Sequence, residues 1–179
     1  IDNEDYFKGR QLEKDENGKL YKDNDERAIF FAKGVIETVK KLNWAPDIIH
    51  VQGWIAMLMP LYCKHYYTDE PILANTKVVS SIFNAPFEEP LSSNLIKKLA
   101  FDGLDGELTK DLKTPNFSAL AKNAIANSDG LIIADTDIDK SVKKEILSSN
   151  KPILHSSSKE GFEEDYKEFY TNQILNLEK

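Results

Sequence analysis

Polar side chains and a tryptophan follow a short apolar run in residues 47–58, which read DIIHVQGWIAML. His50, Gln52 and Trp54 lie at the end of this run, and Gly53 turns the chain toward a helix-compatible segment. In open parallel sheets, ligands bind beyond the carboxyl ends of strands. Backbone N–H groups after Gly53 would suit an anion or sugar hydroxyls. Alternatively, His50 bonds a neighbouring carbonyl and Trp54 packs under the sheet.

A second apolar run, residues 77–82, places another polar side chain at a predicted strand end. It is followed by Phe83, Asn84, Ala85 and Pro86. If both runs are parallel strands of one sheet, Asn84 shares a crevice with Gln52. The alternative interpretation is that Asn84 begins an Asx-turn before Pro86 and needs no ligand.

Paired carboxylates, Asp135 and Asp137, follow a third apolar run and could hold Mg²⁺, as in phosphatases that place D-x-D after a strand. We favour the other interpretation, in which Asp137 is the N-cap of the next helix. His65 and His155 have no partner at the spacing of a metal site or a catalytic triad. The sequence therefore predicts neither a metal site nor a cofactor.

These residues must be positioned by alternating strands and helices. Short buried runs predict strands at 48–51, 77–82, 131–134 and 152–154. Apolar residues at helical spacing predict helices at 24–43, 54–66, 92–101, 117–127, 138–148 and 160–177. The alternation predicts an α/β fold, a Rossmann-like parallel sheet with helices on both faces.

Local signals refine this scheme. Asn17-Gly18 predicts an exposed hairpin or loop within residues 11–25. Asp23 and Glu26 are spaced as in a capping box, and Pro60 should kink the second helix. The region between the second strand and residue 116 is expected to hold at most one short helix. In the last helix, Phe162, Tyr166, Phe169 and Tyr170 form one stripe, which we assign to core packing and not to stacking on sugar rings.

The length and composition of the chain exclude several classes of function. With 179 residues and 41% hydrophobic content, we expect one domain over 1–179. A net charge of -7 disfavours nucleic acid as a partner. Cys63 is the only cysteine, which excludes an internal disulfide and fits a reducing cytoplasm. The sequence has no apolar run of about 18 residues and no signal peptide pattern, so we expect no membrane association.

Residues 24–66 and the two strand ends resemble bacterial glycogen synthases and plant starch synthases, with weaker similarity over residues 1–148. That family has H-x-H-D-W where this chain has His50-Val51-Gln52-Gly53-Trp54, and T-x-H-N where it has Ser81-Ile82-Phe83-Asn84. The resemblance implies the N-terminal half of a two-domain GT-B glucosyltransferase that transfers glucose from ADP-glucose to an α-1,4-glucan. It also implies a sugar-binding site; its residues here would be His50, Gln52, Gly53, Trp54 and Asn84.

The departures from the family pattern concern the same site. Gln52 replaces a histidine that contacts the glucosyl group, Gly53 replaces an aspartate, and Phe83 replaces the histidine of T-x-H-N. An amide can hydrogen-bond a hydroxyl but cannot become charged near neutral pH.

The family's K-x-G-G-L loop and C-terminal domain are also not found in this chain. No cluster of Lys or Arg replaces them as a diphosphate site. We therefore expect this chain alone to be a poor catalyst or inactive, and we assign no catalytic residue. The alternative is a catalytically degenerate domain that binds glucan or regulates an active synthase; whether subunits associate is left open.

Overall fold

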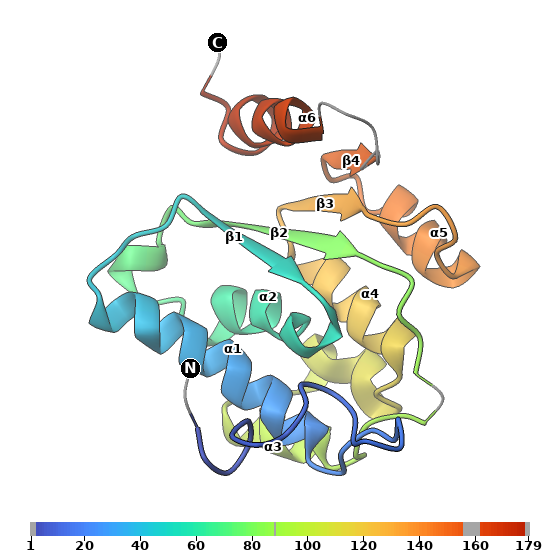
Figure 1. The fold of residues 1–179 in the computed structure, drawn as a ribbon. Coiled ribbons are helices and arrows are strands. Elements are labelled where there is room, and N and C mark those ends of the chain that lie inside the picture. The colour runs from blue at the N-terminus through green and yellow to red at the C-terminus, as the bar shows by residue number, and fades with distance from the viewer. Residues whose placement is uncertain (1–2, 88, 156–161, 178–179) are drawn as a thin grey trace.

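The computed structural model describes residues 3–87, 89–155 and 162–177. Its sheet has four strands in the order β1-β2-β3-β4, and every pairing is parallel (Figure 1). The strands are β1 (Ile48–Gln52), β2 (Lys77–Ile82), β3 (Gly130–Ile133) and β4 (Ile153–His155). The predicted parallel α/β sheet is therefore confirmed.

Helices precede, connect and follow these strands. The α-helices are α1 (Asn24–Lys41), α2 (Met59–Leu61), α3 (Leu95–Phe101), α4 (Phe117–Asn127), α5 (Lys140–Ser148) and α6 (Phe162–Glu168). Helices α1, α2 and α4 lie on one side of the sheet, and α6 lies on the other (Figure 1). Helices thus cover both faces, as predicted.

The larger core lies between the sheet and the helices α1, α2 and α4. On α1, Ala28, Ala32 and Ile36 recur every four residues and are fully buried, so one face of the helix packs inward. Val51 of β1 and Leu131 of β3 face the same core. Full burial of a valine, leucine or isoleucine side chain stabilises the fold by about 1.5–3 kcal/mol.

A smaller core covers the opposite face, because successive strand residues point to opposite sides. Val79 of β2 and Ile132 of β3 pack there against Phe169 and Ile174, which lie in a π-helical turn, Phe169–Ile174, directly after α6. Core packing is confirmed for the predicted aromatic stripe except at Phe162, which is 49% exposed. The predicted start of this helix at residue 160 lies outside the described residues.

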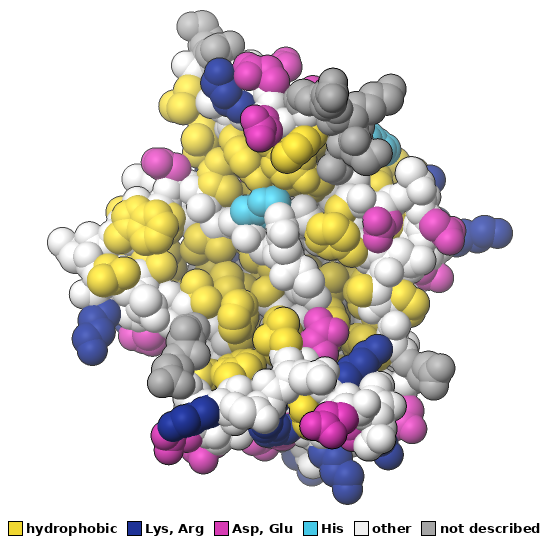
Figure 2. Space-filling model, in the orientation of Figure 1, with side chains coloured by type: hydrophobic (Ala, Val, Ile, Leu, Met, Phe, Trp, Pro, Cys, Tyr) yellow, Lys and Arg dark blue, Asp and Glu magenta, His cyan; other side chains and the backbone are white. Residues whose placement is uncertain are grey.

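The surface in Figure 2 has apolar side chains across its middle and most charged side chains near its periphery.

The N-terminal segment forms the predicted hairpin. Lys14 and Leu20 make an antiparallel bridge, and the Asp15 carboxylate accepts hydrogen bonds from the N–H groups of Asn17 and Lys19, both at 2.9 Å. Gly18, with φ 76°, adopts the left-handed conformation that this turn requires.

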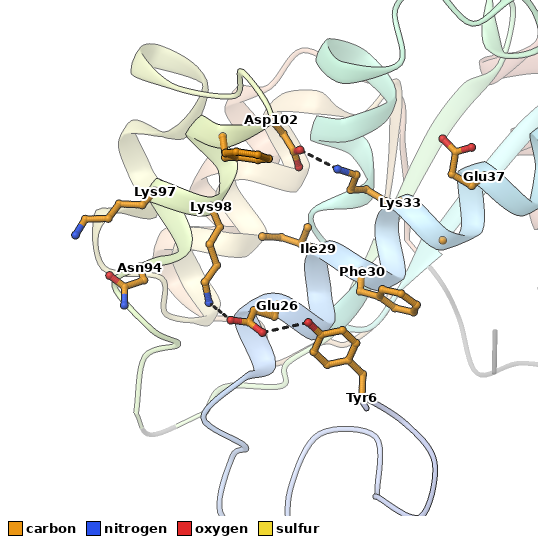
Figure 3. Close-up of a pocket in the computed structure, with 12 residues that line it drawn as sticks. Tyr6, Glu26, Ile29, Phe30, Lys33, Glu37, Asn94, Lys97, Lys98 and Asp102 are labelled. Atoms are coloured by element: carbon orange, nitrogen blue, oxygen red, sulfur yellow. Dashed lines mark hydrogen bonds and ion pairs between the residues drawn. The ribbon is translucent and has the colours of Figure 1, made fainter. Parts of the chain in front are cut away.

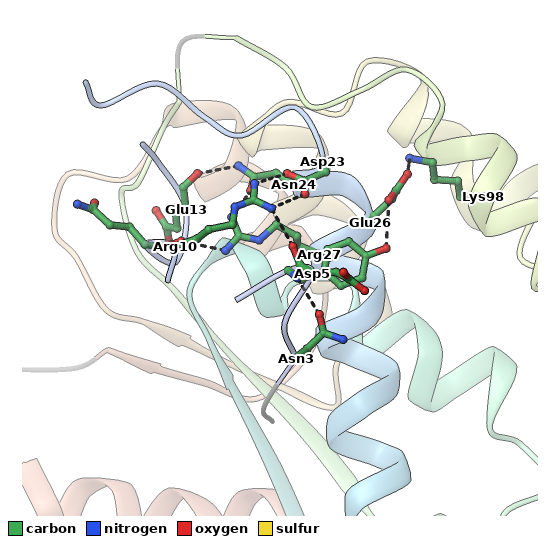
Figure 4. Close-up of polar contacts among 11 residues, drawn as sticks. Asn3, Asp5, Arg10, Glu13, Asp23, Asn24, Glu26, Arg27 and Lys98 are labelled. Atoms are coloured by element: carbon green, nitrogen blue, oxygen red, sulfur yellow. Dashed lines mark hydrogen bonds and ion pairs between the residues drawn. The ribbon is translucent and has the colours of Figure 1, made fainter. Parts of the chain in front are cut away.

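The predicted capping box at the start of α1 is wrong. Asp23 occupies the N-cap, but its carboxylate accepts two hydrogen bonds from Arg10, at 2.7 and 2.8 Å, and none from the helix backbone (Figure 4). Glu26 instead pairs with Lys98 of α3 at 2.7 Å. Charged partners distant in sequence compete successfully for both carboxylates, because charge-assisted hydrogen bonds are stronger than neutral ones.

Two further predictions need correction. Asp137 does not cap α5: the N-cap is Asp139, whose carboxylate accepts from the N–H groups of Ser141 and Val142 at 2.9 and 3.2 Å. The region before residue 116 holds α3 and also a 3₁₀ helix, Gly106–Lys113, which the sequence analysis missed.

The predicted helix 54–66 is broken into separate turns. A 3₁₀ turn, Trp54–Ala56, precedes α2, and a π-helical turn, Tyr62–Tyr66, follows it. Pro60 lies in the first turn of α2, where its missing N–H costs no helical hydrogen bond. The chain therefore restarts its helix at the proline, where a kink was predicted.

Candidate functional site

The carboxyl ends of all four strands meet at one edge of the sheet. The register pairs Gln52 with Ser81, Ile82 with Ile133, and Ile133 with His155. The loops that follow each strand therefore begin side by side. This edge is where open parallel sheets bind ligands.

The His50 ring faces the C-terminal helix, by which we mean α6 together with the π-helical turn that follows it, and both ring nitrogens contact other side chains. Its Nε2 lies 2.7 Å from Ser81 Oγ, and its Nδ1 lies 2.8 Å from the hydroxyl of Tyr170. Burial lowers the pKa of His50 below its usual value and raises the pKa of Tyr170 to about 12. In this arrangement His50 joins two strands to the C-terminal helix.

Gln52, Gly53 and Trp54 differ in their accessibility. The Gln52 side chain is exposed, whereas Trp54 is 2% exposed and packs edge-on against Phe87, with ring centroids 5.5 Å apart. Gly53 has φ 78° and ψ 151°, and a Cβ there would meet no atom within 4 Å. The turn after β1 is therefore open at Gly53.

Asn84 is exposed just beyond β2, and its backbone N–H donates to Asp135 Oδ2 at 2.7 Å. This hydrogen bond joins the ends of β2 and β3. Asp135 also lines a cavity of 200 Å³ together with Lys143 of α5 and His155 of β4. Only the tertiary fold brings Lys143 and His155 to Asp135, so no local sequence signal predicts this cluster.

A polar cleft of 520 Å³ lies beside the buried Trp54. Phe87, the ring on which Trp54 packs, lines it from one side, and the hairpin residues Lys14 and Lys19 line it from the other. Glu89 adds an acceptor. Donors, an acceptor and an aromatic ring in one cleft suit a hydroxyl-rich ligand, and no local sequence signal identified this cleft.

Arg27 of α1 anchors the hairpin wall of this cleft (Figure 4). Its side chain is fully buried, donates to the Gln11 carbonyl at 2.9 Å, and lies over the rings of Phe7 and Tyr21 at 4.9 and 4.7 Å. Burial lowers its pKa. Asn24 adds a hydrogen bond to the Glu13 carbonyl at 2.8 Å, so α1 holds the hairpin at two points.

Residues 3–87, 89–155 and 162–177 contain no group of three or more His, Cys, Asp or Glu that could hold a metal ion. Within the same ranges no helix is long and apolar enough to cross a bilayer.

The parallel sheet and the polar edge define a Rossmann-like domain of the α/β class. Residues 1–165 match the family model described as the starch synthase catalytic domain. The chain is 33% identical over 163 residues to a glycogen synthase of Chlorobium luteolum, a match over 86% of this chain and 33% of that protein. It is 31% identical over 130 residues to a glycogen synthase of Clostridium perfringens, over 72% of this chain and 27% of that protein.

This chain belongs to the starch synthase catalytic domain family. It spans about a third or less of the length of these curated relatives. Among solved structures, the catalytic domain of Starch Synthase IV from Arabidopsis thaliana bound to ADP and acarbose has a TM-score of 0.55 and 20% identity. That match covers 76% of this chain and 30% of the other, and it confirms the shared fold.

Proposed function

We propose that this domain forms part of a glucosyltransferase that moves glucose from ADP-glucose to the end of an α-1,4-glucan. The match of residues 1–165 to the starch synthase catalytic domain carries this proposal. The relatives named glycogen synthase and the structural neighbour bound to ADP and acarbose support it. A cytoplasmic location, predicted from the single cysteine, is part of the same proposal.

The sugar would bind at the carboxyl edge of the sheet. The exposed Gln52 amide and Asn84 side chain can each donate to and accept from a hydroxyl group. The turn at Gly53 is itself open, since a Cβ there would meet no atom beyond the neighbouring residues within 4 Å. His50 and Trp54 serve this site by position, because His50 bonds to β2 and the C-terminal helix, and Trp54 supports the Phe87 ring.

This chain would bind the sugar, and groups outside it would stabilise the departing diphosphate. Transfer from ADP-glucose requires cationic groups, preorganised where charge develops on the departing diphosphate. At the sheet edge, Lys143 is the lysine that lines the cavity beside Asp135 and His155. A single lysine beside a carboxylate supplies little net positive charge, so we expect a further domain or partner subunit to complete the reaction.

Titration with an α-1,4-linked maltooligosaccharide tests the site. Loss of one neutral hydrogen bond costs about 0.5–1.5 kcal/mol, so Gln52→Ala and Asn84→Ala should each weaken binding by about 2- to 12-fold. Gln173→Ala is the matched control, because Gln173 is exposed on the C-terminal segment. Equal affinity in all three variants would show that the sugar binds elsewhere.

A transfer assay tests the activity itself. Labelled glucose from ADP-glucose should reach glycogen when the complete gene product is used. This chain alone and its Gln52→His, Phe83→His double variant provide the comparison. Glycogen binding without transfer by the complete product would instead identify a glucan-binding partner of an active synthase.

A further inference from the structure

A groove of 910 Å³ runs between α1 and α3 (Figure 3). Every third or fourth residue of α1 from Glu26 to Glu37 lines one wall, and α3 lines the other. Ile29 and Phe30 supply apolar surface from α1. The side chains of α1 and α3 form two facing rows with a depression between them, and side chains from another pair of helices can pack into such a depression.

An exposed aromatic ring stands beside this groove. Phe101, the last residue of α3, is 92% exposed and is the most exposed large apolar side chain that the structure describes. It also lines the groove. A single exposed ring is ordinary, but Phe101 lines the same groove as Ile29 and Phe30, and contiguous exposed apolar surface marks interaction sites. One face of the molecule thus carries both an apolar projection and an apolar hollow.

The charged side chains along the groove differ between its two ends. Three ion pairs bridge the two helices: Lys98 pairs with Asp25 at 2.6 Å and with Glu26 at 2.7 Å, and Lys33 pairs with Asp102 at 2.8 Å, so these charges are already paired. Lys97, the neighbour of Lys98 in α3, extends on the side of α3 away from α1 (Figure 3) and has no ion pair with any residue in the described ranges.

Glu37 lies at the opposite end of the groove, beyond the Lys33 pair (Figure 3). Its side chain is 55% exposed, and its ion pair with Lys40 of the same helix is 3.2 Å long. An ion pair between neighbouring exposed residues is weak. Glu37 therefore keeps an accessible negative charge, and the groove is positive at one end and negative at the other.

We propose that a second copy of this chain docks across the groove on a two-fold axis. Each Phe101 enters the apolar hollow of the other copy, and each Lys97 faces Glu37 of the other copy. A two-fold axis perpendicular to the groove reverses its direction, so opposite charges meet at both ends. A projection and a hollow on the same face are the condition for such a self-complementary contact.

Sedimentation of the whole chain over a range of concentrations tests this dimer. Phe101→Asp removes two buried rings per dimer and should weaken association by roughly 100-fold or more. Leu147→Asp is the control, because Leu147 is 59% exposed on α5, outside the groove. A wild-type chain that stays monomeric overturns the proposal, and so does equal dimerisation of both variants.

Reversal of the end charges tests the orientation. Lys97→Glu and Glu37→Lys should each weaken the dimer by about 5-fold or more, since each creates two like-charge contacts. The double variant exchanges the charges on both copies and should restore wild-type association. Additive weakening in the double variant overturns the two-fold arrangement. Maltooligosaccharide binding by Phe101→Asp should be unchanged, which separates this test from that of the proposed function.

Discussion

Truncation of Phe169 should release the C-terminal helix from the sheet without unfolding the rest of the domain. Phe169 is 1% exposed and lies with Ile174, Val79 and Ile132 in the small core on the outer face of the sheet. The larger core on the other face contains none of these four residues. The attachment of this C-terminal segment therefore depends on few contacts, and Phe169 is the largest of the buried side chains that make them.

The size of the effect follows from this burial. Phe169 and Ile174 are the fully buried side chains that the C-terminal segment supplies, and each contributes about 1.5–3 kcal/mol. Phe169→Ala should remove about 2–3 kcal/mol of docking free energy. Amide hydrogen exchange in residues 165–174 should then accelerate by roughly 30- to 150-fold. Amides of α1 should exchange at the wild-type rate.

Phe162→Ala is the matched control, since Phe162 lies in α6 but is 49% exposed. Its exchange rates should resemble those of the wild type. The reasoning is refuted if Phe169→Ala accelerates exchange equally in α1 and in residues 165–174. That outcome would mean that the helix and the main core unfold as one unit.

Three other predictions concern single side chains. Burial lowers the pKa of His50, so the unfolded state binds more protons than the folded state at acidic pH. Docking of the C-terminal helix on the sheet should therefore weaken as the pH falls below about 6.5. His50→Gln should remove this pH dependence when amide hydrogen-exchange rates are measured over a pH series. Burial raises the pKa of the Cys63 thiol from 9.0 to about 12, which reduces the fraction of reactive thiolate at pH 8. Alkylation of Cys63 at pH 8 should therefore be about 1,000-fold slower in the native chain than in the denatured chain. Equal alkylation rates would contradict the burial of the thiol. Asp139→Ala should lower the urea midpoint at pH 7, whereas Asp137→Ala should not. Hydrogen bonds from Ser141 lower the pKa of Asp139 below its usual 3.8, so the difference should begin to shrink as the pH falls below 3.8 and should vanish once Asp139 is also protonated in the folded state. A difference that does not shrink at all in this range would exclude a capping role for the carboxylate.

The fold was largely predictable because its signals are local. Strand β2 and helix α4 have the predicted bounds, since short apolar runs and helical spacing depend only on neighbouring residues. The capping predictions failed for a different reason. The side chain that binds Asp23 is Arg10, which is 13 residues away, and a helix start can use either of two nearby aspartates.

The candidate site was predictable only in part. Gln52 and Asn84 could be placed at one edge, because parallel strands end together. The contact between the Asn84 N–H and Asp135 joins residues 51 positions apart, and the cleft at Phe87 is closed by a hairpin near residue 17. No periodicity records such distances, so these features appear only in the folded chain.

The sequence by itself determined the order of strands and helices, the parallel sheet and the family. These follow from hydrophobic spacing and from residue types at strand ends, which the chain carries locally. Only the tertiary structure decided that His50 bonds Tyr170, that Trp54 is buried under Phe87, and that Phe101 stands exposed beside a groove. Burial and partnership depend on which distant elements pack together, and that is settled by the competition among all contacts of the folded state.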